Sequence, residues 1–350
     1  PTATAEPTAS PTAPAIVYGP DSFPVGVNPL TGLEVDDPTI LDRRPVMVKV
    51  QNIPRYDRPQ FGLSLADIVY EYYTEEGATR FAAIYYGQDA EVVAPIRSAR
   101  FIDMQLVQMY DSVFVFGSAY SVLRNRLFSA DFANRLIIEG NNWLPAVQRY
   151  DPNKRNYLSV NTAALQSVLT KNGVDNQRQD LAGMYFSSDV PQGGEEVEQF
   201  VVRYSSAIYN RWDYDPATGR YLRFEDTEND TTGGKNEVFA QLTDALNDEP
   251  VTADTVVMVV VQHEIRDPSA GTEVVDMQLL GRGEAYVARD GKIYTAQWQR
   301  QQPGDVLSLV DANGDPFPFK PGQTWFEIMS ASTTVDDSTD TWRFVFGRDW

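Results

Sequence analysis

Two arginines three residues apart, Arg97 and Arg100, are the side chains best placed to do chemistry in this 350-residue chain. They belong to the stretch VAPIRSAR, residues 93–100, and Ser98 lies between them. A guanidinium group is a planar fork of N–H donors that binds carboxylate or phosphate oxygens in pairs. The pair therefore predicts an anion-binding site. The alternative from these residues alone is a pair of surface arginines that holds carboxylates of the same chain.

The arginines lie where a predicted strand is followed by a predicted helix. The apolar residues 92–94 precede them, and Ile102, Leu106 and Met109 recur at helical spacing within residues 101–110. The unpaired N–H groups at a helix N-terminus attract anions. We therefore expect the start of this helix to contribute to the same site.

Polar residues on neighbouring segments are candidates to shape the pocket. Asp67 and Glu71 share one face of a predicted strand, because side chains alternate along a strand with period two. Carboxylates near arginines could hold a divalent cation that bridges to phosphate, or could be structural partners of the arginines. We expect Glu75 and Glu76, which lie in a turn, to be structural partners. The candidate ligand-binding residues are Arg97, Arg100, Arg80, Ser98, Asn52, Arg58, Asp67 and Glu71, and no catalytic residue or metal ligand is assigned.

Composition removes several common kinds of catalytic site. The chain has no cysteine, which excludes disulfides, thiol nucleophiles and thiolate metal sites. His263 is the only histidine, so a multi-histidine metal site is excluded, and its place at a predicted strand end favours a structural role. The formal net charge of −20 argues against a nucleic-acid partner, which needs a basic face. Any anion site must then be a local positive pocket in a negative molecule.

The chain divides into three predicted parts. Residues 1–20 form a Pro/Thr-rich tract that we expect to be a disordered tether, since such tracts stay extended and solvated. Residues 21–190 alternate strands and helices, which predicts a layered α/β domain with a mixed sheet. Residues 198–350 are rich in short strands and turns, which predicts a mostly β domain and an α+β fold overall. No apolar run reaches the length that crosses a membrane.

Three further local patterns predict particular elements. Residues 161–173 have Asn161 as a helix cap and a glycine stop, which is typical of a helix. Residues 118–128 and 237–246 are further helix candidates. The pair Asp290 and Gly291 between two alternating stretches predicts a tight hairpin.

Long ordered motifs in this chain resemble the YerB-like family of bacterial lipoproteins. They are NPLTGL, RPVMVKVQN, RPQFGLSLADIVYE, EEGATRFAAIYY and APIRSAR, followed by GRGEAY, DANG and PGQTWFEI in the second half. The resemblance covers residues 28–329 and implies an exported, lipid-anchored protein of two domains with no known activity. The stretch KRNYLS lacks the histidine that the family usually shows but retains Asn156, which joins the candidate ligand-binding residues on this ground.

The first half is also similar, more weakly, to the LytR-CpsA-Psr envelope phosphotransferases. That similarity implies binding of a polyprenyl pyrophosphate and a divalent metal. Asp67 stands where that family has an Arg-Ser-Asp-Thr stretch, and Arg97 lies where it has Pro-Arg-Asp. Ala66 and Ser98 replace a serine and an aspartate of the family pattern, so a metal site would lose a ligand.

We therefore expect an extracytoplasmic protein, lipid-anchored at the outer face of the cytoplasmic membrane, that binds an anionic envelope ligand through its arginines. The ligand would be a phosphate-bearing lipid or glycan, and no cofactor is expected. One alternative is a metal-assisted phosphotransferase or phosphohydrolase, which requires Asp67 and Arg97 in one pocket with Mg²⁺. Another is an interaction scaffold for an envelope protein, without a small-molecule site. Whether the protein is an enzyme stays open.

Overall fold

The structure, a computed structural model, describes residues 15–151, 157–267, 271–348 and 350. Most of the predicted tether therefore lies outside the described residues. Strands dominate both halves, and within the described ranges three α-helices all lie in the first half. The prediction of an α+β fold, with a mostly β second half, is confirmed. None of the described helices is long and apolar enough to cross a membrane.

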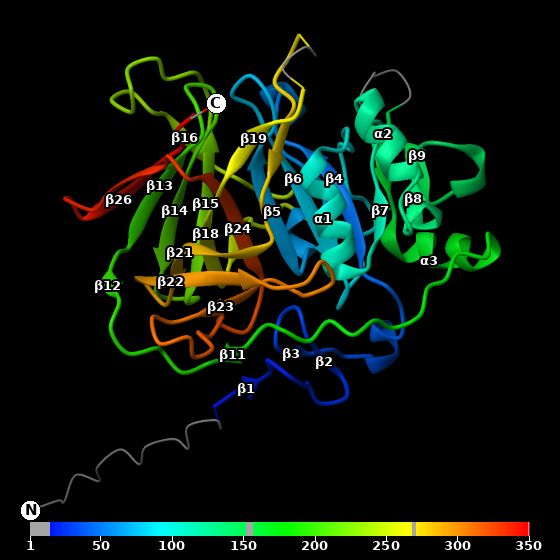
Figure 1. Cartoon of the computed structure of the whole chain (residues 1–350), viewed down its shortest axis with the longest axis horizontal. Coiled ribbons are helices and arrows are strands. Elements are labelled where there is room, and N and C mark those ends of the chain that lie inside the picture. Colours follow the sequence, from blue (N-terminus) through cyan, green and yellow to red (C-terminus); the bar gives the residue numbers. More distant parts are fainter. Residues whose placement is uncertain (1–14, 152–156, 268–270, 349) are drawn as a thin grey trace, which may run out of the picture.

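The largest sheet has 11 strands and runs through both halves of the chain (Figure 1). Its strands in spatial order are β12 (Glu195–Glu196), β22 (Lys292–Arg300), β21 (Gly281–Arg289), β18 (Thr255–Val261), β24 (Thr324–Ser330), β5 (Ile68–Tyr73), β6 (Thr79–Tyr85), β4 (Val46–Gln51), β7 (Val113–Val115) and β8 (Leu136–Ile137), with β23 (Ser308–Val310) beside β22. The halves join at one parallel pair, in which β5 lies beside β24. The two halves thus share a continuous sheet.

A second sheet of seven strands packs against one face of the first. Its strands in order are β16 (Phe239–Gln241), β15 (Arg220–Asp226), β14 (Tyr209–Asp215), β13 (Gln199–Arg203), β26 (Thr341–Val345) and β25 (Thr334–Asp336), with β17 (Thr252–Ala253) beside β15. Trp212 of this sheet meets Trp325 of the first sheet edge-on, with 5.3 Å between ring centroids. Both indoles are fully buried, so the core lies between the two sheets.

The other face of the large sheet is covered by helix α1 (Phe101–Tyr110), beside which lie α2 (Ser121–Phe128) and α3 (Thr162–Lys171) (Figure 1). The bounds predicted for α1 are confirmed. Helix α3 is also confirmed, and the Asn161 side chain accepts a hydrogen bond from the Ala164 N–H at 2.8 Å as its N-cap. Helix α2 starts three residues later than predicted, because the Ser118 carbonyl accepts the Ala99 N–H in the preceding connection.

The helix predicted over residues 237–246 is wrong. Part of this segment is strand β16, which pairs antiparallel with β15. The Asp244 carboxylate then accepts the backbone N–H groups of Gly62 and Ser64, at 2.7 and 2.8 Å. These partners lie far away in the sequence, and they outweigh the local helical preference.

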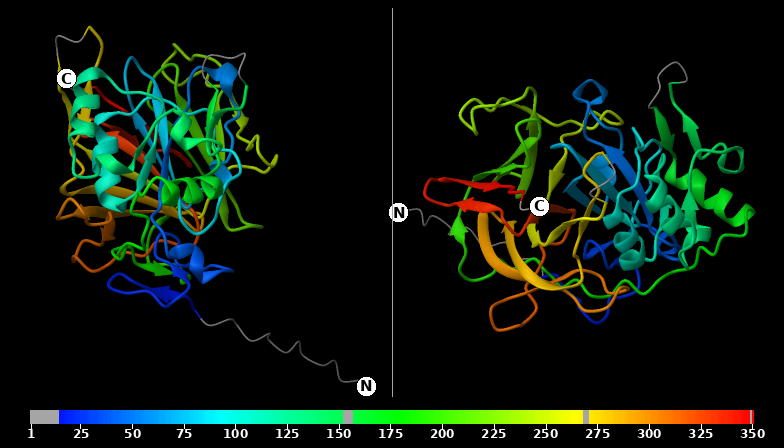
Figure 2. Two further views of the ribbon diagram at one scale, coloured as in Figure 1. Left: turned by 90° about the vertical axis from the view of Figure 1, so that its right-hand side faces the viewer. Right: turned by 45° about the horizontal axis from the view of Figure 1, so that its top comes forward.

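Short ribbons and single turns complete the described chain. The ribbons are β1 (Val17–Tyr18) with β11 (Phe186–Ser187), β2 (Val27–Asn28) with β3 (Leu33–Glu34), β9 (Val147–Arg149) with β10 (Leu158–Val160), and β19 (His263–Ile265) with β20 (Val275–Met277). The 3-10 turns are η1 (Pro38–Leu41), η2 (Arg55–Asp57), η3 (Leu63–Leu65), η4 (Ala133–Arg135) and η5 (Asn141–Trp143). The β2–β3 ribbon lies at the lower end of the molecule, and the C-terminus lies at the upper end (Figures 1 and 2). The hairpin predicted at Asp290 and Gly291 is confirmed between β21 and β22, with positive φ at both residues.

Candidate functional site

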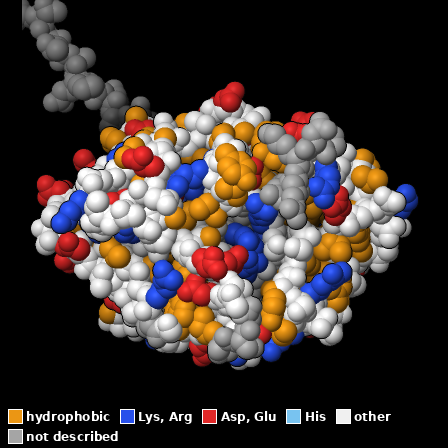
Figure 3. Space-filling view, turned by 90° about the horizontal axis from the view of Figure 1, so that it is seen from above, with side chains coloured by type: hydrophobic (Ala, Val, Ile, Leu, Met, Phe, Trp, Pro, Cys, Tyr) orange, Lys and Arg blue, Asp and Glu red, His pale blue; other side chains and the backbone are white. Residues whose placement is uncertain are grey.

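Three predicted arginines come together at the upper end of the large sheet. Arg80 is the second residue of β6, next to the turn that joins β5 to β6. The Arg97 N–H donates a hydrogen bond to the Lys49 carbonyl on β4, and Arg100 directly precedes α1. Their side chains are between 17% and 22% exposed. Burial, followed by the charges of Arg100 and Arg97, lowers the pKa of Arg80 to about 10. Figure 3, which looks down on this end, shows basic side chains in a central hollow with acidic side chains beside them.

Two of these arginines are held by one carboxylate of the turn between β5 and β6. Arg100 donates from Nε to Glu75 Oε2 at 2.6 Å, and its Nη2 pairs with Oε1. Arg80 donates from Nη2 to Glu75 Oε1 at 3.1 Å. Both arginines also donate to the Ser98 carbonyl, at 2.7 Å from Arg80 and 3.3 Å from Arg100. Arg80, Arg97 and Arg100 with Glu75 are called the arginine corner below.

Arg97 differs from its two neighbours. Its guanidinium donates no hydrogen bond to any residue that the structure describes, and its only ionic contact there is Asp57 Oδ2 at 3.9 Å from Nη2. That distance exceeds the 2.7–3.2 Å of an N–H···O hydrogen bond. Asp57 is already occupied, because it accepts hydrogen bonds from Gln51 Nε2 at 2.5 Å and from the Tyr157 hydroxyl at 2.7 Å. The donors of Arg97 therefore remain available at a partly exposed position.

Three buried polar side chains form a floor below the corner, and sequence reasoning missed them. Lys49 Nζ lies 3.3 Å from Asp103 Oδ1, and the Tyr72 hydroxyl pairs with both groups. Burial lowers the pKa of Lys49 to about 7, and the charges of Arg80 and Arg100 act in the same direction. A lysine within the otherwise apolar strand VMVKV was the available signal.

The start of helix α1 is partly satisfied by the protein itself. Asp103, in the first turn, accepts the Arg100 N–H on Oδ2 at 2.6 Å. The predicted contribution of this helix N-terminus to an anion site is reduced accordingly, since a carboxylate already stands there. Ser98 lies beside this start, and its hydroxyl is 2.7 Å from the Ser118 hydroxyl at a cavity of about 250 Å³.

Glu71 lies on the opposite face of the sheet from this floor, against the second sheet. It is beside Glu327 in the β5–β24 register. Arg223 on β15 reaches both carboxylates, with Nη2 2.5 Å from Glu71 and Nη1 3.0 Å from Glu327. The guanidinium also stacks over the Trp325 ring at 4.3 Å. Burial raises the pKa of Glu71 to about 8; the Arg223 charge opposes this shift and the Glu327 charge adds to it.

Asn52 and Arg58 extend the same group of residues. Asn52 Nδ2 donates to Glu71 Oε1 at 3.0 Å, and Arg58 Nη2 donates to Asn52 Oδ1 at 2.7 Å. Arg58 also pairs with Glu225 at 3.1 Å and with Asp226 at 3.2 Å. The structure thus does not place Asn52, Arg58 and Glu71 as ligand contacts, because their polar groups are used to hold the sheets together. We call Arg55, Arg58, Arg223, Glu71, Glu225, Asp226 and Glu327 the inter-sheet cluster.

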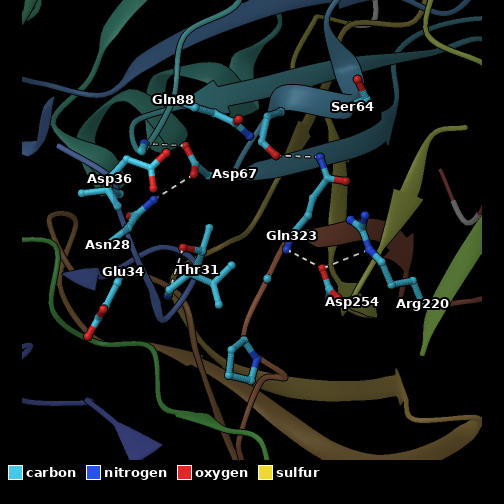
Figure 4. A pocket seen from close by; sticks show the side chains of 16 residues that line it. Asn28, Thr31, Glu34, Asp36, Ser64, Asp67, Gln88, Arg220, Asp254 and Gln323 are labelled. Atoms are coloured by element: carbon cyan, nitrogen blue, oxygen red, sulfur yellow. Dashed lines mark hydrogen bonds and ion pairs between the residues drawn. The ribbon is translucent and has the colours of Figure 1, made fainter. Parts of the chain in front are cut away.

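Asp67 lies just before β5, at the opposite end of this strand from the corner. Its oxygens accept hydrogen bonds from Asn28 Nδ2 at 2.8 Å and from the Tyr86 and Gly87 N–H groups at 2.5 and 3.1 Å. Burial raises the pKa of Asp67 to about 6. The residue lines a polar cleft of about 510 Å³ near the β2–β3 ribbon, which also contains Arg220 (Figure 4). Since β5 separates Asp67 from Arg97, the structure does not provide the shared pocket that metal-assisted phosphotransfer requires.

Two predicted features remain. Asn156 lies outside the described residues. Within the described ranges, no group of three or more His, Cys, Asp or Glu side chains is placed to hold a metal ion. At the corner, the partly exposed guanidinium groups are of the chemical type that binds anions.

Comparisons with known proteins give consistent matches over most of the chain. Residues 30–175 match the profile described as the N-terminal domain of a protein of unknown function (DUF3048), and residues 200–326 match the C-terminal domain of the same family. The "Putative lipoprotein YerB" of Bacillus subtilis (strain 168) is 30% identical over 305 residues, which cover 86% of this chain and 85% of the relative. The crystal structure of the YerB protein from Bacillus subtilis is similar with a TM-score of 0.72 and 27% identity, over 86% of this chain and 96% of that one.

Proposed function

Since this chain belongs to the DUF3048 family, which confirms its resemblance to YerB-like proteins, we propose that it binds a phosphate-bearing ligand of the cell envelope at the arginine corner. The relative named as a lipoprotein supports an anchored, extracytoplasmic protein. We place it at the outer face of the cytoplasmic membrane. The ligand class is a phosphate ester of a lipid or a glycan.

The observation that carries this proposal is the state of Arg97. Arg80 and Arg100 donate hydrogen bonds to the Glu75 carboxylate and to backbone carbonyls. Arg97, beside them, is 22% exposed and donates no hydrogen bond to a described residue. A guanidinium that is partly buried and makes no hydrogen bond to the protein loses hydration without gaining a hydrogen-bond partner. A bound phosphate would supply that partner with two parallel hydrogen bonds.

The charge balance around the corner supports the same ligand. Four basic side chains face three carboxylates in this region. Below pH 7, where Lys49 is charged, one positive charge is in excess within a chain of net charge −20. The basic members are Lys49, Arg80, Arg97 and Arg100, and the acidic members are Asp57, Glu75 and Asp103; together they are called the corner cluster. Because the groups are partly shielded from water, an anion interacts with them more strongly than at an open surface.

The test is binding of inorganic phosphate, measured by isothermal titration calorimetry. We expect Arg97→Ala to weaken binding at least about tenfold, because a charged hydrogen-bonded contact is lost. Arg178→Ala is the matched control: this arginine is exposed and lies 3.7 Å from Asp42 near the lower end, away from the corner. Equal binding by the wild type and Arg97→Ala, or no binding by the wild type, contradicts the proposal.

A further inference from the structure

Tyr56 is held out into solvent by an anchored turn. It is the middle residue of η2, directly after β4, and it is 80% exposed. The turn is closed by backbone hydrogen bonds from the Asp57 N–H to the Pro54 carbonyl at 3.1 Å and from the Arg58 N–H to the Arg55 carbonyl at 3.0 Å. The position of the exposed ring is therefore set by the backbone.

Both residues beside Tyr56 are fixed through their side chains. Arg55 pairs with Asp226 and donates from Nη1 to Asn229 Oδ1 at 2.9 Å. On the other side, Asp57 is buried and accepts the two hydrogen bonds described above. A rigid aromatic side chain loses little conformational freedom when it makes a contact. The turn thus presents a preorganised apolar surface.

The Tyr56 ring takes little part in the packing of the described fold. No hydrogen bond from its hydroxyl and no ring pair with a described aromatic residue is present, and Phe128, the other strongly exposed aromatic side chain, is 43% exposed. Single exposed apolar residues are common on protein surfaces. The exposure of Tyr56 is of interest because this residue lies close in the chain to the contact between Asp57 and Arg97.

Tyr56 directly precedes the residue that contacts Arg97. The residue next to it, Asp57, provides the only ionic contact of Arg97 in the described chain. The pKa of Arg97 is lowered by burial, and the Asp57 and Tyr56 side chains both oppose that shift. The phenol is thus within electrostatic reach of the guanidinium. Figure 3 shows apolar surface next to the basic hollow on this face.

We propose that Tyr56 contacts the ligand and that the ligand is a glycosyl phosphate, with its phosphate on Arg97 and its sugar ring on the face of Tyr56. This inference rests on the proposed function, because it requires the phosphate to bind at the corner. A pyranose ring has a C–H face that is apolar and hydroxyl groups around its edge. The aromatic face of Tyr56 covers the former, while the hydroxyl groups at the ring edge stay in contact with water.

A ring fits this surface better than a prenyl chain. A flexible chain gains affinity by burying its length, so it needs a groove. Tyr56 instead offers a single exposed ring on a short turn. The cavity with apolar lining near α2 lies on the Arg100 side of Ser98, and neither Tyr56 nor Arg97 borders it. The geometry therefore selects the glycan source of the phosphate over the lipid source.

The experiment compares three probes by calorimetry: inorganic phosphate, glucose 1-phosphate and farnesyl phosphate. We expect the wild type to bind glucose 1-phosphate about tenfold more tightly than inorganic phosphate, as one stacked ring contact allows. Tyr56→Ala should remove this gain and leave binding of inorganic phosphate unchanged. Tyr56→Phe should retain the gain, since it keeps the ring. Phe128→Ala, at the exposed aromatic position on α2, is the matched control and should behave as the wild type.

The outcomes separate this inference from the proposed function. If Tyr56→Ala binds glucose 1-phosphate as the wild type does, or if farnesyl phosphate binds more tightly than glucose 1-phosphate, the glycosyl assignment is overturned while the phosphate site stands. If the wild type binds none of the probes, both are overturned. Thermal unfolding of Tyr56→Ala should match that of the wild type, because the ring takes little part in the packing of the described fold.

Discussion

The two faces of strand β5 carry two buried charge clusters of opposite imbalance. Glu71 points into the inter-sheet cluster, where four carboxylates face three arginines. The next residue, Tyr72, points into the corner cluster, where four basic groups face three carboxylates. Each imbalance is accompanied by a shifted proton equilibrium: the pKa of Glu71 is raised to about 8, and that of Lys49 is lowered to about 7.

The clusters differ in whether the last guanidinium has a protein partner. All three nitrogens of Arg223 hydrogen-bond to carboxylates, and the group is sealed between the sheets. Arg97 is open on its solvent side and lacks such partners among the described residues. A shifted pKa alone does not distinguish a structural ion network from a binding site. The completeness of hydrogen bonding does: it indicates cohesion for the inter-sheet cluster, and it supports the ligand binding that we propose for the corner cluster.

The largest expected effect contrasts the two arginines directly. Arg223→Ala leaves Glu71 and Glu327 buried without their cation, so we expect a loss of about 3–5 kcal/mol in the free energy of unfolding. Arg97→Ala should change it by less than about 1 kcal/mol, because the side chain is partly exposed and its one ionic contact, to Asp57, is long at 3.9 Å. Urea unfolding of both variants measures the difference. Similar losses in the two variants would show that Arg97 is structural and would remove the distinction drawn here.

An intermediate effect concerns pH and the inter-sheet cluster. The folded protein holds a proton on Glu71 that the unfolded chain, with a pKa near 4.5, has released. The stabilisation is therefore full below pH 4.5 and is lost as the pH rises towards about 8, with a slope of at most about 1.4 kcal/mol per pH unit. Glu71→Gln should lack this component. We expect wild-type stability, relative to that of Glu71→Gln, to fall between pH 5 and pH 7, and parallel curves would refute the assignment.

The smallest effect concerns the corner cluster. Lys49 loses its proton as the pH rises through about 7, which removes one positive charge below Arg80 and Arg100. Sulfate, whose charge is constant in this range, should therefore bind about fivefold more weakly at pH 8.5 than at pH 6, a size typical of one charge in a partly buried site. Lys49→Met should bind sulfate independently of pH. An equal pH dependence in this variant would assign it to another group.

Sequence reasoning succeeded where short-range physics decides the structure. The apolar spacing of residues 101–110, the Asn161 cap and the Asp290–Gly291 turn each act over a few residues, and each is confirmed. The segment 237–246 was misassigned because its partners come from β15 and from the distant loop before β5. The helix propensity of a segment contains no information about partners that are distant in the sequence.

The site was predictable to a similar depth. The VAPIRSAR motif supplies two of the three arginines that meet at the corner, Arg97 and Arg100, and Arg80 comes from the segment before it. The turn position of Glu75 indicated its structural role. No pattern in the sequence indicated that Glu71 would form an ion pair with Arg223. The same holds for the ion pair between Arg58 and Asp226, because Arg223 and Asp226 both come from the second half of the chain. Tyr56 lies in the polar segment 55–64, which contains no pattern that singles it out. Its high exposure and the contact of the next residue with Arg97 are visible only in the structure.

The parallel pairing of β5 with β24 determines when the largest sheet can form during synthesis of the chain. Ile68 on β5 can pair with Thr324 on β24 only after 256 further residues have been synthesised, since 324 − 68 = 256. Until then an interior strand shows an open edge, the kind of surface that joins strands of other chains. Closing so long a loop is slow relative to local folding. A chain that is synthesised from its N-terminus therefore completes its largest sheet only when nearly all of its residues are present.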